Sequence, residues 1–149
     1  MLQDSFKIIG DVRLEHYGAT GELLTTQNIH NLVVTTGRNV IADRMKGTPT
    51  KAAMTHMAVG TSSTAAVIGD TTLGAEVSAS RTALTSTSVT TNVITYTCTF
   101  GAGVGTGALV EAGLFNASSA GDMLCRTVFA VINKGASDSV VVTWTVTIT

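Results

Sequence analysis

The sequence is short of charged residues. Asp, Glu, Lys and Arg make up 13% of its 149 residues, with 9 basic and 10 acidic side chains and a formal net charge of −1. In ordinary soluble domains roughly a quarter of the residues are charged. A chain this close to neutral has no field to gather DNA, RNA or an anionic membrane surface, so we expect neither nucleic acid nor membrane among its partners. A weakly charged surface instead favours a subunit that packs against neighbouring proteins.

Long apolar segments are also lacking. No apolar run approaches the ~18 residues that a membrane-spanning helix needs. The first residues, MLQDSFKIIGDVRLEHYG, interleave acids and bases and contain no signal-peptide core. No linker, internal repeat or low-complexity tail is visible. The sequence therefore predicts one domain over residues 1–149, large enough to bury a core and made in the cytoplasm.

The residue patterns of metal sites and active sites are missing. The two cysteines, Cys98 and Cys125, form no CxxC pair, and HExxH and GxSxG are absent. The three histidines are isolated from one another in the sequence: His16, His30 and His56. We therefore expect no metal, no catalytic residue and no small-molecule substrate. Whether the two cysteines pair in a disulfide stays open from the sequence.

A glycine-rich stretch, FGAGVGTGALVEAGLF (100–115), is the one place where a cofactor deserves consideration. Gly103, Gly105 and Ala108 fit a loose dinucleotide-binding pattern, GxGxxA. That pattern needs an amphipathic helix after the glycines, and no helical stripe follows here. No Gly-Lys-Ser/Thr follows either, so the phosphate loop of nucleotide-binding proteins is excluded. We predict a bend between two strands and no cofactor.

Threonine is the most frequent residue, and with valine it favours β-structure because both side chains are branched at Cβ. The periodicity agrees with this. In SVVVTWTVTIT (139–149) Val140, Val142, Trp144, Val146 and Ile148 fall on one face of a strand, with threonines mainly on the other. The same alternation appears at 92–100 and near the start, and further strands are predicted at 22–26, 108–115 and 122–132. The expected fold is all-β, a single antiparallel β-sandwich, jelly-roll-like, of about seven or eight strands.

Two segments depart from this alternation. TTGRNVIADRMKG (35–47) has apolar residues at helical spacing, with Thr35 or Thr36 as a candidate N-cap and Gly47 as a stop, so it predicts one short helix. Residues 61–80 lack a sustained period and are rich in small side chains, which predicts a long ordered loop. Residues 1–9 are a candidate docking arm, and the loop 61–80 is a second candidate for contacts with a larger assembly.

Six residues are candidates for structural or interface roles. Glu111 places a carboxylate in an otherwise apolar strand, and we expect it to pair with Arg81 or Arg126 and fix the register. The hydroxyl-bearing face of the last strand offers close packing between subunits without charge, through Thr143, Thr145 and Thr147.

Several short motifs occur in an order that resembles small structural proteins of tailed bacteriophages. AVGT (58–61) ends a strand, a small-residue loop follows, and LGAE (73–76) precedes Arg81. After an alternating strand come EAGLF (111–115), a hairpin, and a Lys-Gly turn (134–135) before the last strand. This order is shared with phage tail-collar fibre domains and extends from residue 56 to the end. Those domains normally precede a fibre shaft, and no shaft sequence is present here.

The resemblance implies a virion protein with a mechanical function. A stand-alone β-domain of this size is similar to a capsid decoration, or cement, subunit that stabilises the particle. The alternative is a tail-associated adaptor or collar-fibre component. The implied partners are further copies of the chain, in trimers, and the major capsid protein or tail and fibre proteins. A carbohydrate-binding module is a third hypothesis. Such a module needs exposed aromatic side chains, and most aromatic residues of this sequence fall on inward-facing positions, so the hypothesis is disfavoured.

Overall fold

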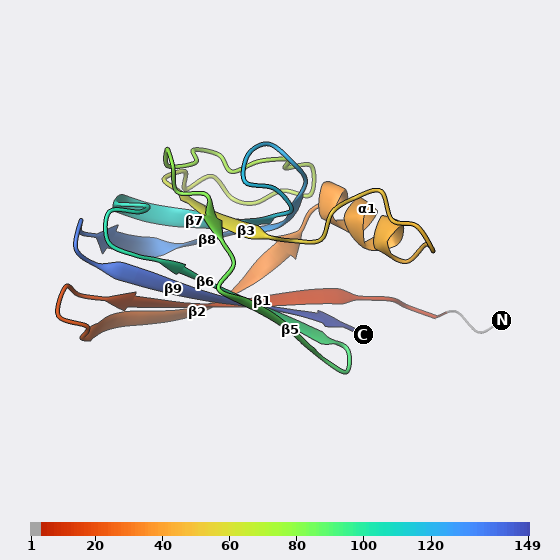
Figure 1. Cartoon of the computed structure of the whole chain (residues 1–149), viewed down its shortest axis with the longest axis horizontal. Coiled ribbons are helices and arrows are strands. Elements are labelled where there is room, and N and C mark those ends of the chain that lie inside the picture. The colour runs from red at the N-terminus through yellow and green to blue at the C-terminus, as the bar shows by residue number, and fades with distance from the viewer. Residues whose placement is uncertain (1–3) are drawn as a thin grey trace.

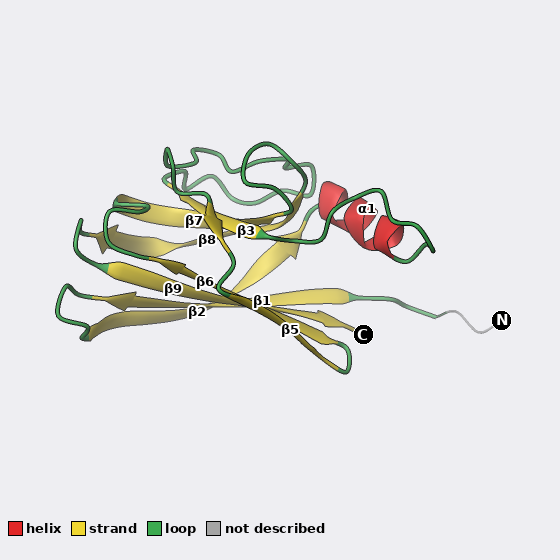
Figure 2. Cartoon of the chain, viewed as in Figure 1, coloured by secondary structure: helices red, strands yellow, loops and turns green. Residues whose placement is uncertain are grey.

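The computed structural model describes residues 4–149 and contains nine strands and one helix (Figure 2). In chain order these are β1 (Ile8–Tyr17), β2 (Leu23–Val33), α1 (Thr35–Arg44), β3 (His56–Gly60), β4 (Thr82–Ala83), β5 (Ser86–Thr90), β6 (Val93–Phe100), β7 (Gly107–Phe115), β8 (Met123–Lys134) and β9 (Ser139–Ile148). The expected all-β fold with one short helix is confirmed. Of the strands, β4 and β5 were not predicted, since neither carries an alternating apolar pattern.

All nine strands belong to one antiparallel sheet in the order β4-β3-β7-β8-β2-β1-β9-β6-β5. The sheet curls so that its two halves face each other (Figure 1). Strand β2 forms the corner, because it pairs with β1 as far as Asn31 and then with β8 through Leu32 and Val33. The two layers are therefore halves of one continuous sheet, a half-barrel, and not two separate sheets.

The core fills the space between the halves. The predicted alternation of β9 holds in the structure, with Val140, Val142, Trp144 and Val146 all buried. Buried side chains of β3, β7 and β8 meet them from the other half and complete one continuous apolar cluster, including Met57, Leu109, Leu114 and Ile132. In β9 the period-two pattern thus records which face of the strand lies inside.

Helix α1 follows the corner strand directly and packs against β8. Neither predicted threonine is the N-cap, which is Val34 and makes no side-chain capping bond. Thr36 instead donates its hydroxyl hydrogen to the Met123 carbonyl oxygen at 2.8 Å, which ties the helix to β8. The helix ends at Arg44, before the predicted Gly47. There Met45 N–H bonds to the Ala42 carbonyl in the tighter pattern common at helix ends.

Residues 61–80 form a loop without a helix, and its later part runs along the outer edge of β3. Thr61 N–H bonds to the Ala75 carbonyl and Val77 N–H to the Val59 carbonyl, both at 2.9 Å. Gly60 and Glu76 form an isolated bridge. This long loop therefore covers one edge of the sheet.

The glycine-rich stretch is a bend between β6 and β7, as predicted, and a strand follows it where a nucleotide fold would need a helix. Gly103, Gly105 and Gly107 all have positive φ, a conformation that other residues rarely adopt. The amine of Lys134 donates to the Gly101 carbonyl at 2.8 Å. This contact holds the bend against the end of β8.

Both cysteines are free and buried. Cys98 lies on β6 and Cys125 on β8, so they come from opposite halves of the sheet. Burial raises the pKa of the Cys98 thiol to about 12 and raises that of Cys125 well above its usual range. Neither is a reactive thiolate at neutral pH.

Candidate functional site

Glu111 of β7 is fully buried and holds the long loop in place. Its Oε1 accepts hydrogen bonds from the backbone N–H groups of Ser62 (3.2 Å) and Ala75 (2.7 Å). Its Oε2 accepts a third from Gly74 N–H at 2.9 Å. Ser62 lies at the start of the loop, and Gly74 and Ala75 lie in its later part, so one carboxylate joins two distant parts of the loop.

Arg126 of β8 is the charge partner of Glu111. Its Nε and Nη2 lie 2.9 and 2.8 Å from Glu111 Oε2, and both side chains are almost completely inaccessible to water. The same guanidinium donates from Nη1 to Asp70 and from Nη2 to the Thr64 carbonyl, each at 2.9 Å. Arg126 therefore holds the loop at Thr64 and Asp70, while Glu111 holds it at Ser62, Gly74 and Ala75.

Arg81, the other candidate partner for Glu111, pairs with Glu76 instead, at 2.7 and 3.1 Å. Its guanidinium lies 3.6 Å from the centre of the Phe115 ring. It also donates to the carbonyl oxygens of Ala117 and Ala120 in the β7–β8 hairpin loop. Arg81 thus joins the long loop to that hairpin, and it plays no part in the Glu111 cluster.

The three candidate threonines lie on the outer face of the half formed by β1, β6 and β9. Thr143 is flanked across the strands by Arg13 and Thr97, and Thr145 by Asp11 and Thr95. All three are half-buried by these cross-strand neighbours, Thr147 included. Toward β5 and β6 this face carries only Ser, Thr and Val side chains, so this part of the face is uncharged.

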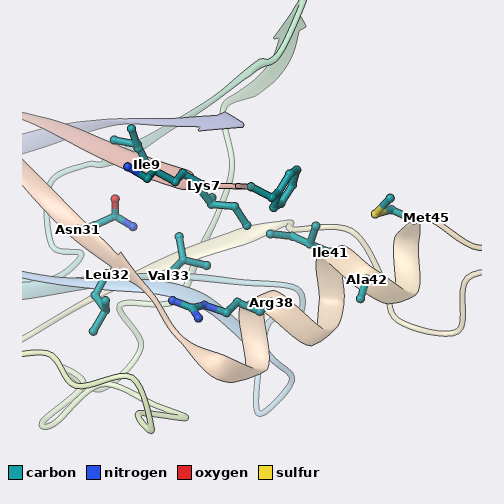
Figure 3. A pocket seen from close by; sticks show the side chains of 11 residues that line it. Lys7, Ile9, Asn31, Leu32, Val33, Arg38, Ile41, Ala42 and Met45 are labelled. Carbon is teal, nitrogen blue, oxygen red and sulfur yellow. The ribbon is translucent and has the colours of Figure 1, made fainter. Parts of the chain in front are cut away.

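A surface groove lies between the start of β1 and helix α1, and its volume is about 490 Å³. The sequence did not predict this groove. In Figure 3, Ile41 of the helix and Met45, the residue just after it, lie on one side, and Lys7 and Ile9 lie on the other. Met45 is 80% exposed and Phe6, at the mouth, is 64% exposed. The groove therefore has exposed apolar side chains along its border.

Two cations border the groove. Lys7 and Arg38 both line it, and neither forms an ion pair with a carboxylate of residues 4–149. The rest of the lining is apolar apart from Asn31. The groove is therefore suited to an apolar segment that also carries negative charge. The helical spacing of apolar residues placed Ile41 on a predicted helix, but only the fold brings Ile41 opposite the start of β1.

The predicted docking arm, residues 1–9, falls in three parts. Met1 to Gln3 lie outside the described residues. Lys7 exchanges backbone hydrogen bonds with Thr149, and Ile8 and Ile9 belong to β1. Among the described residues only positions 4–6 precede this pairing, and the part of the arm that lines the groove is residues 6–9.

A second polar pair, formed by the buried His16 and the partly exposed Asp138, lies at the opposite end of β1. Nε2 of His16, which is almost fully buried, is 2.9 Å from Asp138 Oδ2, and Gly135 N–H donates to the same oxygen at 2.7 Å. The hydrogen bond with His16, followed by that from Gly135, lowers the pKa of Asp138. The pair fixes the turn that leads into β9, which is a structural task.

Within residues 4–149, no group of three or more His, Cys, Asp or Glu side chains is placed to hold a metal ion. No helix of the described chain is long and apolar enough to cross a bilayer. No protein-family model matches the sequence, and neither a curated protein nor a solved structure matches it significantly.

Proposed function

We propose that this protein is a non-enzymatic structural subunit of a tailed-phage virion that binds the capsid surface as a decoration subunit and stabilises the particle. The order of AVGT, LGAE and EAGLF motifs supports the assignment to phage structural proteins. The observation that carries the docking role is the groove, where exposed apolar side chains lie beside the cations Lys7 and Arg38.

The occupant of the groove is an apolar segment of the major capsid protein that carries acidic residues. Apolar side chains of that segment cover Phe6, Ile41 and Met45, and its carboxylates neutralise Lys7 and Arg38. Binding of this kind favours the assembled shell over its dissociated subunits by mass action. Copies of the chain also associate with one another, in trimers, through the threonine-bearing outer face of β9, which carries Thr143 and Thr145.

The copy number in purified virions tests the location. Quantitative mass spectrometry compares this chain with the major capsid protein. Hundreds of copies per particle are expected of a decoration subunit, whereas about three to a few dozen indicate the tail or a fibre joint, where symmetry repeats are few. Absence from the particle overturns the proposal.

Charge reversal in the groove tests the docking site. Arg38→Glu is expected to weaken binding to particles that lack the protein by about tenfold or more, because it places a negative charge against an acidic partner. Arg44→Glu makes the same charge change on the same helix but outside the groove, and it serves as the control. Equal binding by the two variants would show that the groove is not the docking site.

A further inference from the structure

The two edges of the sheet differ in whether other parts of the chain cover them. At the β3 edge, the segment from Ala75 to Leu84 supplies backbone partners, including Val77 N–H to Val59 and Leu84 N–H to the Thr55 carbonyl at 2.9 Å. The edge strand there, β4, has only two residues. Covering and shortening an edge in this way prevents further strand pairing.

The β5 edge has no such protection. Strand β5 is the last in the sheet order, and β6 is its one strand neighbour among the described residues (Figure 1). All five of its residues, Ser86–Thr90, are exposed, and Val89 is 66% exposed. The strand contains no charged residue, no proline and no register shift. An open edge of this kind is a template for another strand.

The backbone groups that face outward on β5 follow from the ladder. The Asn92 carbonyl accepts a hydrogen bond from Ile148 N–H on β9, so the backbone groups of Val93 point the other way, toward Thr90. In an antiparallel pair this direction alternates along the strand. The N–H and C=O groups of Thr87 and Val89 therefore point away from β6 and lie open to a partner.

We propose that this edge pairs with the β5 strand of a second copy of the chain, antiparallel and about a two-fold axis at Ser88. Such a contact requires a surface that complements itself. The sequence S-T-S-V-T is symmetric in kind about Ser88: hydroxyl residues at 86, 88 and 90, and β-branched residues at 87 and 89. Thr87 then exchanges backbone hydrogen bonds with Val89 of the second copy, and Ser86 faces Thr90.

The side-chain chemistry of both faces favours a second copy over an unrelated strand. Val89 shares its face with Ile94 and Val146, so pairing packs it against a β-branched threonine in continuation of the core. The opposite face, with Ser88 beside Thr95, continues the hydroxyl face of β6 and β9 across the joint. No like charges meet, since β5 and β6 carry none.

A disulfide trap tests the axis. Ser88→Cys places two thiols at a non-hydrogen-bonded pair, where Cα atoms are about 4.5 Å apart, within the range of a disulfide. Ser86→Cys on the same strand is the control, because its two copies lie roughly 13 Å apart in this register. On mild oxidation Ser88→Cys is expected to form covalent dimers at least about tenfold faster, because the paired thiols are held together. Equal rates for the two variants overturn the proposal.

Mass in solution gives an independent test. A two-fold joint requires an even number of subunits, a dimer or, combined with a three-fold contact, a hexamer. Ser88→Lys is expected to halve that mass, because it sets like charges directly opposite each other, and an equal mixture with Ser88→Glu is expected to restore it. Ser119→Lys, in an exposed hairpin loop, controls for added charge. A monomer or trimer for the unmodified chain overturns the proposal, as does failure of the mixture to restore the mass. Virion copy number tests the phage assignment separately, so the two proposals can fail independently.

Discussion

Arg126 is a buried charged side chain with three partners. It lies 2% exposed against the fully buried Glu111, and it also binds Asp70 and the Thr64 carbonyl. Removal of one partner of a buried pair leaves the other as an uncompensated charge. We predict that Arg126→Met lowers the free energy of unfolding by about 3–5 kcal/mol, measured by urea denaturation.

Arg44→Met, an exposed arginine on α1, is the matched control for this substitution and should change stability by less than about 0.5 kcal/mol. A similarly small effect for Arg126→Met would mean that the loop contacts, and not the ion pair, hold the cluster together.

Asp138 makes the stability of the folded protein depend on pH in the acid range. Its pKa is lowered by the hydrogen bond with His16 and by that from Gly135 N–H. A carboxyl group with a lowered pKa in the folded state contributes stability above the pKa of the unfolded chain, about 3.9, and loses it as the pH falls through the folded value. Asp138→Asn should therefore lower the Tm at pH 7, and the gap to the unmodified protein should narrow as the pH falls below about 4. Scanning calorimetry from pH 7 to 3 measures this gap, with Asp4→Asn as the control. A gap that stays constant across the range would contradict the linkage.

At the scale of elements, the attachment of α1 to the sheet depends on one close approach. A Cβ atom at Gly37 would lie 2.1 Å from the Leu124 carbonyl oxygen of β8. Alanine is the better helix former by about 1 kcal/mol, but a clash with backbone cannot be relieved by a rotamer change. We predict that Gly37→Ala lowers the free energy of unfolding by about 1–3 kcal/mol, measured by chemical denaturation. Gly47→Ala, where a Cβ meets nothing within 4 Å, should be neutral or slightly stabilising. Equal stability of the two variants would mean that the helix can move away from β8 at no cost.

At the scale of the whole molecule, the two halves share one core. Cys98 and Cys125 lie in opposite halves and belong to the same apolar cluster, which β2 crosses at the corner. A single core unfolds as one cooperative unit. We predict that both thiols become reactive at the same urea concentration, and that this midpoint matches the loss of Trp144 fluorescence. Cys98→Ala and Cys125→Ala report on each thiol separately. Two distinct midpoints would show that the halves unfold independently.

The sequence by itself determined the features that depend on local pattern. Period-two alternation placed the strands around Cys98 and Trp144 and showed which of their faces is buried, because that alternation belongs to the strand alone. Positive φ in a run of glycines needs no tertiary context either, so the bend at 101–107 followed directly. The carboxylate of Glu111 in an apolar strand was enough to predict a charge partner.

Only the tertiary structure decided the rest. Arg126 and Arg81 were equal candidates in the sequence, and the pairing of β7 with β8 selected Arg126 by bringing it beside Glu111. Strand β5 has no apolar alternation to reveal it, and its place at an open edge depends on how all the other strands are ordered. The groove joins the start of β1 to α1, segments that meet because β2 turns the corner between them. Contacts between distant parts of the chain have no local signature, because each side chain meets its partner only when the sheet has curled.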